Sequence, residues 1–421
     1  MTSAGSTILW GVLTFSILVV IHEGGHFLAA RFFGVKVHEF MVGLPGPALR
    51  FRSKRSGTVF GVTAIPLGGY VRIAGMEPGP EDELLASALD SALAAGRIDS
   101  EGLAAELGVE VEHAARLLAT LADWGALAPA TDDEVSYLAA MSARPDDTAA
   151  ETLDLARSVT YRALSKPKRI TVLSMGVIAN LLTALLVFTT VLSVWGYYTQ
   201  SLTLYDVAPD SGAAHAGLQA GDRIAGFDGD EVADWPSLTA AISHTVPGDV
   251  VEIEYLRHGD VRTTEAVIGK SEEGDPVLGV VSDTEHVNLS VPEAAVESVR
   301  MTGMVFAAIG KFFSPSTFQE SVEGARSIVG ISIEVAEAAR TGPLNYAWMV
   351  ALLSLSLGAM NILPIPPLDG GKIAVELIEA AAGRPLGRRF SLGLSLSGAM
   401  LLFSLIGYLM YADVVRYFFQ G

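Results

Sequence analysis

The sequence contains no cysteine, and it has far fewer basic residues than acidic ones. Without cysteine, no disulfide can stabilise a part of the chain outside the cell, and a metal site must use His, Asp or Glu as ligands. Lys and Arg number 28 against 47 Asp and Glu, which gives a formal net charge of -19. A chain with this charge is poorly suited to nucleic acid, whose binding requires a basic surface.

The acidic excess is concentrated in one segment. Between residues 77 and 158, roughly 18 residues are acidic and about 4 are basic, which predicts a solvated insert. Apolar residues recur at helical spacing on both sides of Gly108, and this pattern predicts two short helices joined by a tight turn. The pattern resembles a helix-turn-helix or winged-helix unit.

Half of all residues in the chain, 50%, are hydrophobic, and outside the acidic segment they form long apolar runs. A helix crosses the hydrocarbon core of a membrane with about 20 residues, and the first run exceeds this length. The four runs are residues 8–33, 170–198, 348–363 and 392–410. We therefore expect a multi-pass α-helical membrane protein with about four transmembrane helices.

Basic residues near the ends of these runs predict the orientation, because short cytoplasmic loops are enriched in Lys and Arg. They lie after the first run, before the second, and between the third and fourth: Arg31, Lys36, Arg50, Arg52, Lys54, Arg55 and Arg72; Lys166, Lys168 and Arg169; Arg384, Arg388 and Arg389. These ends are expected in the cytoplasm. The 199–346 region is then expected outside.

Two segments between the runs have β patterns. Residues 34–76 alternate apolar and polar side chains in short stretches, which predicts β-hairpins close to the first transmembrane helix. Residues 202–283 contain strand-like stretches separated by Gly, Pro and Asp turns. Their run Gly217-Leu218-Gln219-Ala220-Gly221-Asp222-Arg223-Ile224 resembles the core of a PDZ domain as found in bacterial proteases.

The first apolar run contains the pattern H-E-x-x-H, as His22-Glu23-Gly24-Gly25-His26. On a helix, the two imidazoles project from one face and suit a zinc ion, with Glu23 as the base that accepts a proton from the attacking water. The alternative without a functional role is a pair of histidines at the membrane interface, with the Glu23 side chain extended towards water. His22 lies about 21 Å of helix, at about 1.5 Å per residue, beyond Ile8, and ionisable groups at such depth are usually functional.

A zinc site with an open position for water or substrate needs a third protein ligand. The stretch 361–371, Asn-Ile-Leu-Pro-Ile-Pro-Pro-Leu-Asp-Gly-Gly, offers Asp369 at the end of the third run. Its prolines end the helix there, and irregular backbone at membrane depth is tolerated where it lines a polar cavity. The alternative without a functional role is that the stretch 361–371 is a cytoplasmic turn at the end of a transmembrane helix.

With both motifs in this order, the chain resembles the site-2 protease family, and among its members the bacterial regulator-of-sigma-E type with a PDZ insertion. The resemblance implies that Asp369 is the third zinc ligand, that Asn361 holds the substrate or the active-site backbone, and that residues 34–76 bind an extended substrate by strand addition. It also implies a bacterial inner-membrane location and single-span substrates, such as anti-sigma factors or remnant signal peptides. One departure is Gly176-Val177-Ile178-Ala179-Asn180, where the family has Gly-Pro-x-x-Asn.

The expected organisation follows from these features. It comprises 1–33, first transmembrane helix; 34–76, membrane-associated β-hairpins; 77–160, helical insert; 161–198, second transmembrane helix; 199–285, PDZ-like domain; 286–346, linker and amphipathic helices; 347–371, third transmembrane helix; and 372–421, cytoplasmic loop and fourth transmembrane helix.

The competing functions are a catalytically idle membrane scaffold whose PDZ-like segment binds chain termini, and a membrane-tethered regulator whose insert binds DNA. Acidic Glu110 and Glu112 on the expected recognition helix oppose DNA binding. For the 77–160 insert, a cytoplasmic protein partner is expected, and a decoration without effect is the alternative.

Overall fold

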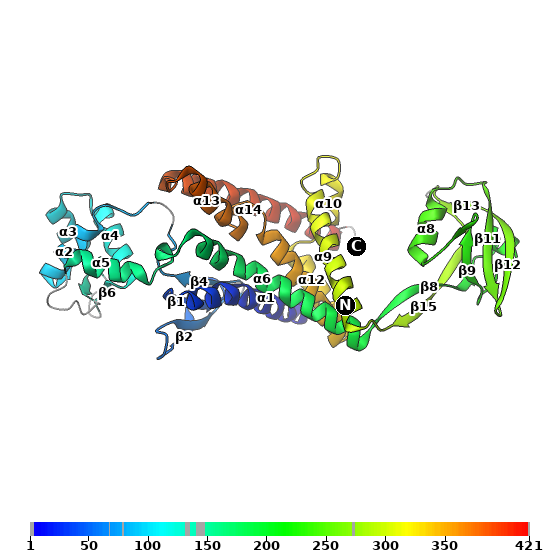
Figure 1. Cartoon of the computed structure of the whole chain (residues 1–421), viewed down its shortest axis with the longest axis horizontal. Helices are drawn as coiled ribbons and strands as arrows, with labels where there is room; N and C mark the ends of the chain where they lie inside the picture. Colours follow the sequence, from blue (N-terminus) through cyan, green and yellow to red (C-terminus); the bar gives the residue numbers. More distant parts are fainter. Residues whose placement is uncertain are drawn as a thin grey trace. The chain divides into compact units, whose positions relative to one another are not determined.

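The computed structural model describes residues 4–66, 68–77, 80–130, 135–139, 148–271 and 274–419 of the chain. The chain divides into two compact units (Figure 1). One consists of Met1–Phe188 and Glu297–Gly421, and the other of Thr189–Val296.

Within the described ranges, four helices are long and apolar enough to cross a membrane. They are α1 (Ala4–Phe32), α6 (Lys166–Thr190) continued by the short π-helix η2 (Val191–Trp195), α12 (Pro343–Asn361) and α14 (Arg388–Phe419). The prediction of four apolar helices is confirmed. Large apolar side chains remain exposed along α14, among them Leu396, Met400 and Phe403. In a membrane, these side chains contact lipid instead of water.

A four-stranded sheet follows α1. Its strands are β1 (Val37–Val42), β2 (Ala48–Arg52), β3 (Val59–Thr63) and β4 (Gly69–Ile73), in the order β2-β3-β1-β4. β1 pairs parallel to β3 and antiparallel to β4, so only β2 and β3 form a hairpin of consecutive strands. The sequence pattern predicts hairpins throughout, and the difference arises because alternation marks strands but does not specify their partners.

Aromatic side chains attach this sheet to the end of α1. The Phe27 ring lies 5.6 Å from the rings of both Phe40 on β1 and Phe60 on β3, and Phe60 stacks on Phe51 of β2 at 5.4 Å. Edge-to-face and offset pairs of this kind add to the free energy gained from burial alone. Because Phe27 directly follows His26, the sheet is held beside the H-E-x-x-H motif.

The acidic insert folds around its own core. Its elements are α2 (Leu85–Ala95), β5 (Arg97–Ile98), α3 (Ser100–Leu107), α4 (Val111–Trp124), β6 (Leu127–Pro129), β7 (Tyr137–Ala139) and α5 (Ala149–Ser158). The three strands form a small sheet in the order β5-β7-β6. Leucines from α2, α3 and α4 are fully buried together, including Leu89, Leu103 and Leu118. The apolar face of the amphipathic helix α4 is therefore buried against the other helices of the insert.

Asp123, near the end of α4, connects the insert to the sheet. Its carboxylate accepts the Gly75 N–H at 2.7 Å and lies 3.3 Å from Nε2 of His38 on β1 and 3.6 Å from Nη2 of Arg72 on β4. Burial raises the pKa of Asp123, but the hydrogen bonds from His38 and Gly75 outweigh it and hold the pKa below its usual value. The group is therefore charged at neutral pH and joins two neighbouring strands to the insert.

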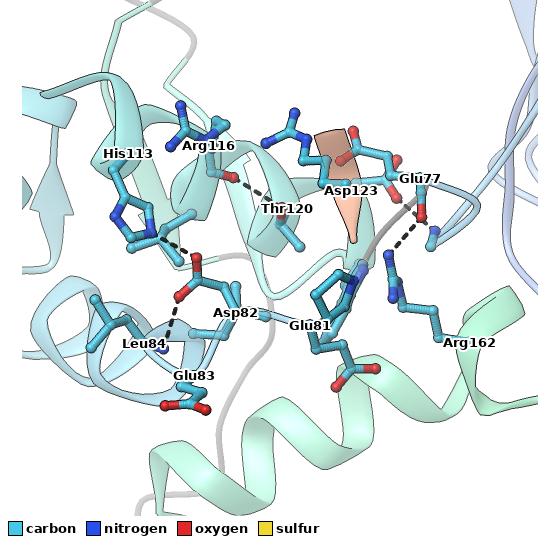
Figure 2. A pocket seen from close by; sticks show the side chains of 16 residues that line it. Glu77, Glu81, Asp82, Glu83, Leu84, His113, Arg116, Thr120, Asp123 and Arg162 are labelled. Carbon is cyan, nitrogen blue, oxygen red and sulfur yellow. Dashed lines mark hydrogen bonds and ion pairs between the residues drawn. The ribbon is translucent and has the colours of Figure 1, made fainter. Parts of the chain in front are cut away.

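A pocket of about 520 Å³ lies beside this connection (Figure 2). Figure 2 shows Asp82 between two donors: its carboxylate accepts the Leu84 N–H at 3.0 Å and lies 2.6 Å from Nε2 of His113. Arg162, in the 3-10 helix η1 (Tyr161–Ala163), donates to the Glu77 carbonyl at 2.6 Å. These bonds order the chain where the insert begins and where it returns to α6.

The Thr189–Val296 unit is rich in strands. Its elements are β8 (Tyr197–Val207), α7 (Gly212–His215), β9 (Arg223–Phe227), β10 (Asp230–Glu231), α8 (Trp235–Ser243), β11 (Val250–Arg257), β12 (Asp260–Val267), β13 (Gly269–Lys270), β14 (Pro276–Val277) and β15 (Val280–Val287). The main sheet has the order β12-β11-β9-β8-β15, with β10 paired to β9. Asp222 of the Gly-Asp motif is buried and accepts two hydrogen bonds of 2.7 Å from Arg257 of β11. It also accepts the Gln219 N–H at 2.8 Å, which closes the turn before β9.

The unit of Met1–Phe188 and Glu297–Gly421 is called the membrane unit below. It also contains most of α9 (Val291–Lys311) and all of α10 (Phe318–Gly324), α11 (Ile328–Thr341) and α13 (Asp369–Ala382). Helices α11 and α12 both pack on α1. Thr14 of α1 shares a hydrogen bond of 2.9 Å with the Tyr346 hydroxyl of α12, and the Trp10 ring lies 4.9 Å from the Tyr346 ring. The helix that carries H-E-x-x-H is thus held in place by α11 and α12.

Candidate active site

His22 and His26 lie one turn apart on α1, as the spacing of H-E-x-x-H requires. Both side chains are buried, and their rings meet edge to face with centroids 4.9 Å apart. The two Nε2 atoms are 3.4 Å from each other. Two nitrogen donors therefore converge on one point inside the membrane unit.

Asp369 brings a carboxylate to the same point from the first turn of α13. Its Oδ2 lies 3.0 Å from Nε2 of His22 and 2.9 Å from Nε2 of His26. Within the described part of the chain, the ligand atoms of these three residues all lie within 4.8 Å of one another. The other carboxylate oxygen, Oδ1, is 3.1 Å from Nζ of Lys372. Residues separated by 347 positions in the sequence therefore form one cluster.

The turn between α12 and α13 places Asp369. Helix α12 ends at Asn361, and the prolines at positions 364, 366 and 367 prevent it from continuing. The new helix begins at Asp369, so its side chain stands at the helix start. Asn361 is buried, and its amide donates to the Leu357 carbonyl at 2.9 Å.

Close approach of α1 and α6 depends on two glycines. A Cβ atom at Gly25 would lie 2.1 Å from the carbonyl oxygen of Met175, and one at Gly176 would lie 2.3 Å from Nε2 of His26. Both distances are far shorter than real Cβ contacts. Any side chain at Gly176 would therefore displace the imidazole that faces Asp369.

Hydrogen bonds from α6 orient both imidazoles. Nδ1 of His26 donates to the Val172 carbonyl at 2.8 Å, and Nδ1 of His22 lies 3.2 Å from Nδ2 of Asn180. Because a carbonyl oxygen can only accept, His26 carries its proton on Nδ1, and its Nε2 lone pair points to the cluster. Second-layer partners of this kind orient metal-ligating histidines in proteins.

Glu23 follows His22 on α1 and is partly buried. It is close enough to His22, His26, Asp369 and Lys372 to interact with each electrostatically. A carboxylate in this position can exchange a proton with a water molecule held at the cluster.

The donor set fits zinc. Two imidazole nitrogens and one carboxylate oxygen are the ligands of catalytic zinc sites, which keep a fourth position open. Three such donors gathered within hydrogen-bond distance of one shared point, in the apolar interior of a membrane unit, match this requirement. When bound, zinc would be held by His22, His26 and Asp369.

Sequence reasoning missed several contacts around this cluster. The Val172 carbonyl leaves no trace in the sequence, because any residue supplies a carbonyl. Lys372 follows Asp369 by three positions, and this helical spacing was a usable signal. Asn180 belongs to the Gly-x-x-x-Asn stretch, but its proximity to His22 becomes visible only when α1 and α6 pack.

A buried cluster of this composition, built from the apolar helix α1 and the start of α13, is typical of a membrane-embedded metalloprotease. The chain belongs to peptidase family M50, the site-2 protease family, whose family model matches residues 10–405. It is accordingly a zinc metalloprotease and a multi-pass membrane protein.

Two relatives cover almost the whole chain. The zinc metalloprotease RasP of Shouchella clausii is 29% identical, with 98% of this chain and 100% of the relative aligned. The regulator of sigma-W protease RasP of Bacillus subtilis is 27% identical, with 98% of this chain and 99% of the relative aligned. Among solved structures, the PDZ domain of the SdrC-like protein from Listeria monocytogenes matches at 24% identity and a TM-score of 0.19, covering 20% of this chain and 88% of that domain.

Proposed function

We propose that the protein cleaves single-span membrane proteins within or near the bilayer, with zinc held by His22, His26 and Asp369 and with Glu23 as general base. The observation that carries this proposal is the convergence of both Nε2 atoms on one oxygen of Asp369. An idle scaffold would leave these buried polar groups without a role, and ionisable groups inside a membrane are energetically unfavourable.

The chemistry assigned to each residue follows from its position. Zinc, when bound, supplies a positive charge that acidifies a water molecule and polarises the scissile carbonyl. Glu23 removes one proton from the attacking water and returns it to the amide nitrogen that leaves. Lys372 is bonded to Oδ1 of Asp369, which leaves Oδ2 directed at the two imidazoles. We also propose that Asn361, at the end of α12, holds the substrate or the backbone around the site.

The four-stranded sheet is the proposed substrate-binding element. Its edge strands are β2 and β4, and an edge strand presents backbone N–H and C=O groups that can pair with an extended peptide. The aromatic contacts to Phe27 hold this sheet next to the helix turn that carries His26. Strand addition would extend a transmembrane substrate that is otherwise helical, which exposes a peptide bond for attack.

Purified protein tests the proposal directly. We expect about one zinc per chain by elemental analysis, because three protein ligands form one catalytic site. In liposomes, the protein should cut a single-span reporter tagged at both ends. Cleavage should stop after treatment with a chelator and resume when zinc is restored. Cleavage that persists after complete removal of zinc would contradict the proposal.

Anti-sigma factors and remnant signal peptides are the proposed substrates. The name of the B. subtilis relative links that protein to sigma-W regulation, which supports the first of these classes. The proposed orientation places the basic ends of α1 and α6 in the cytoplasm and the Thr189–Val296 unit outside, as a PDZ-like domain. Because the chain lacks cysteine, a single cysteine introduced at Ser271 is a unique target for a membrane-impermeant maleimide; cells in which it resists labelling would contradict this orientation.

For the insert, we propose a winged-helix-like docking domain that controls the substrate-binding sheet. The order of α2, β5, α3, α4, β6 and β7, with a three-stranded sheet, supports this fold. The acidic surface of the insert favours a basic protein segment over DNA as its partner. The exposed Glu112 of α4 contributes to this surface. The proposal that the insert controls the sheet is supported by Asp123, whose carboxylate contacts both β1 and β4.

Replacing Asp123 by alanine should raise the KM for a membrane substrate about tenfold, since loss of a charge-assisted contact amounts to about 1.5 kcal/mol. The looser ends of β1 and β4 would bind an added strand less well, whereas zinc content and kcat should change little. Steady-state cleavage measures this, with Asp90→Ala, an exposed acid on the same insert, as the matched control. Equal KM values in the two variants would count against control of the sheet by the insert.

A further inference from the structure

Asn180 lies in the middle of α6 with its side chain completely buried. Its Nδ2 is 3.2 Å from Nδ1 of His22, and its Oδ1 has no hydrogen-bond partner among the described residues. A buried amide oxygen without a partner is energetically unfavourable. The position of this side chain beside a proposed zinc ligand therefore calls for a functional explanation.

The two histidines have the same requirement if both bind zinc through Nε2. A neutral imidazole that offers its Nε2 lone pair carries the proton on Nδ1, so Nδ1 needs a hydrogen-bond acceptor. For His26, this acceptor is the Val172 carbonyl at 2.8 Å. For His22, the amide of Asn180 occupies the corresponding place.

An amide offers either a donor or an acceptor at this place. With Nδ2 towards His22, two N–H groups would face each other once Nδ1 of His22 is protonated. A half-turn of the amide exchanges Nδ2 and Oδ1 without any movement of α6, and it brings the unpartnered oxygen to Nδ1. The resulting N–H···O bond would have the same role as the bond between His26 and Val172.

We infer that Asn180 is a positioning residue: its Oδ1 accepts the Nδ1 proton of His22 and thereby fixes the ring in the form that binds zinc through Nε2. This inference rests on the proposed zinc ligands. Ser354 of α12 supports the arrangement from behind, because its hydroxyl donates to the Asn180 backbone carbonyl at 3.0 Å and so ties this turn of α6 to α12.

Two substitutions at position 180 distinguish the hydrogen-bonding capacity of the Asn180 side chain from its volume. Leucine at position 180 has a similar volume but cannot accept a hydrogen bond, whereas aspartate is isosteric and can only accept. Loss of an outer partner of a metal-bound histidine lowers metal affinity about 10- to 100-fold. Asn180→Leu should therefore lose zinc, and Asn180→Asp should retain it.

The test uses full-length protein purified in detergent, loaded with zinc and then exposed to an excess of chelator. Zinc that remains on the protein is measured over time by elemental analysis. We expect zinc release from Asn180→Leu to be about 10 to 100 times faster than from the wild type. Asn180→Asp should release zinc at close to the wild-type rate. Thr183→Val is the matched control, because Thr183 lies one turn further along α6 and its hydroxyl bonds to the Ala179 carbonyl.

The inference would be overturned if Asn180→Leu released zinc at the wild-type rate, or if a folded Asn180→Asp released zinc much faster than the wild type. If Asn180→Asp does not fold, judged by size-exclusion chromatography, the comparison of Asn180→Leu with Thr183→Val decides alone. His22→Ala separates this inference from the proposed site: full zinc in that variant refutes the site itself. Zinc loss from His22→Ala together with tight zinc in Asn180→Leu refutes only the role of Asn180.

Discussion

Glu23→Gln is expected to abolish cleavage while zinc remains bound in full. Glutamine has nearly the same shape, but it cannot accept the proton that the attacking water must lose. General base catalysis contributes about 10²–10⁴-fold to a rate, so cleavage should fall by at least this factor. The three proposed ligands, His22, His26 and Asp369, are all retained in this variant, so zinc binding should persist.

The measurement pairs zinc analysis with a cleavage assay on the same preparation. Glu293→Gln serves as the control, since it removes one carboxylate charge from an exposed position in the first turn of α9. This control should match the wild type in both assays. A Glu23→Gln enzyme that keeps more than a tenth of the wild-type rate would exclude Glu23 as the base.

The apolar helices were predictable because lipid imposes a simple rule on sequence. A segment that crosses a membrane must be apolar along its length, whatever it packs against. For this reason, the four runs in the sequence match the four candidate spans to within a few residues; these spans are Ala4–Phe32, Lys166–Trp195, Pro343–Asn361 and Arg388–Asp413. The spacing of His22 and His26 was equally direct, since a helix places residues i and i+4 on one face.

Contacts between distant segments were less accessible. Asp369 meets His22 across 347 positions, and the sequence pointed to it only through its motif and its inferred depth. The strand pattern of residues 34–76 did not reveal that β1 lies between β3 and β4, because alternation is the same for every pairing. The contact of Asp123 with His38 was invisible for a related reason: neither residue belongs to a motif, and packing of the insert brings them together.

Asp369→Ala is the second substitution with a large expected effect, and it addresses the ligand that lies farthest from the other two in sequence. Removal of its carboxylate leaves two imidazoles and no anionic donor. Zinc affinity should fall by more than about 100-fold, because loss of an outer partner alone lowers affinity about 10- to 100-fold. The purified variant should therefore contain little zinc and should not cleave a membrane substrate.

Asp413→Ala distinguishes a ligand from any buried acid. Asp413 on α14 is also buried, and its carboxylate accepts the Ser327 N–H at 2.7 Å, at the start of α11. Its removal should lower thermal stability, because a buried N–H loses its partner, but zinc content should stay near one per chain. Equal zinc loss in both variants would point to general unfolding, whereas full zinc in Asp369→Ala would remove Asp369 from the site. Only selective loss of zinc in Asp369→Ala agrees with a carboxylate that completes the site from α13.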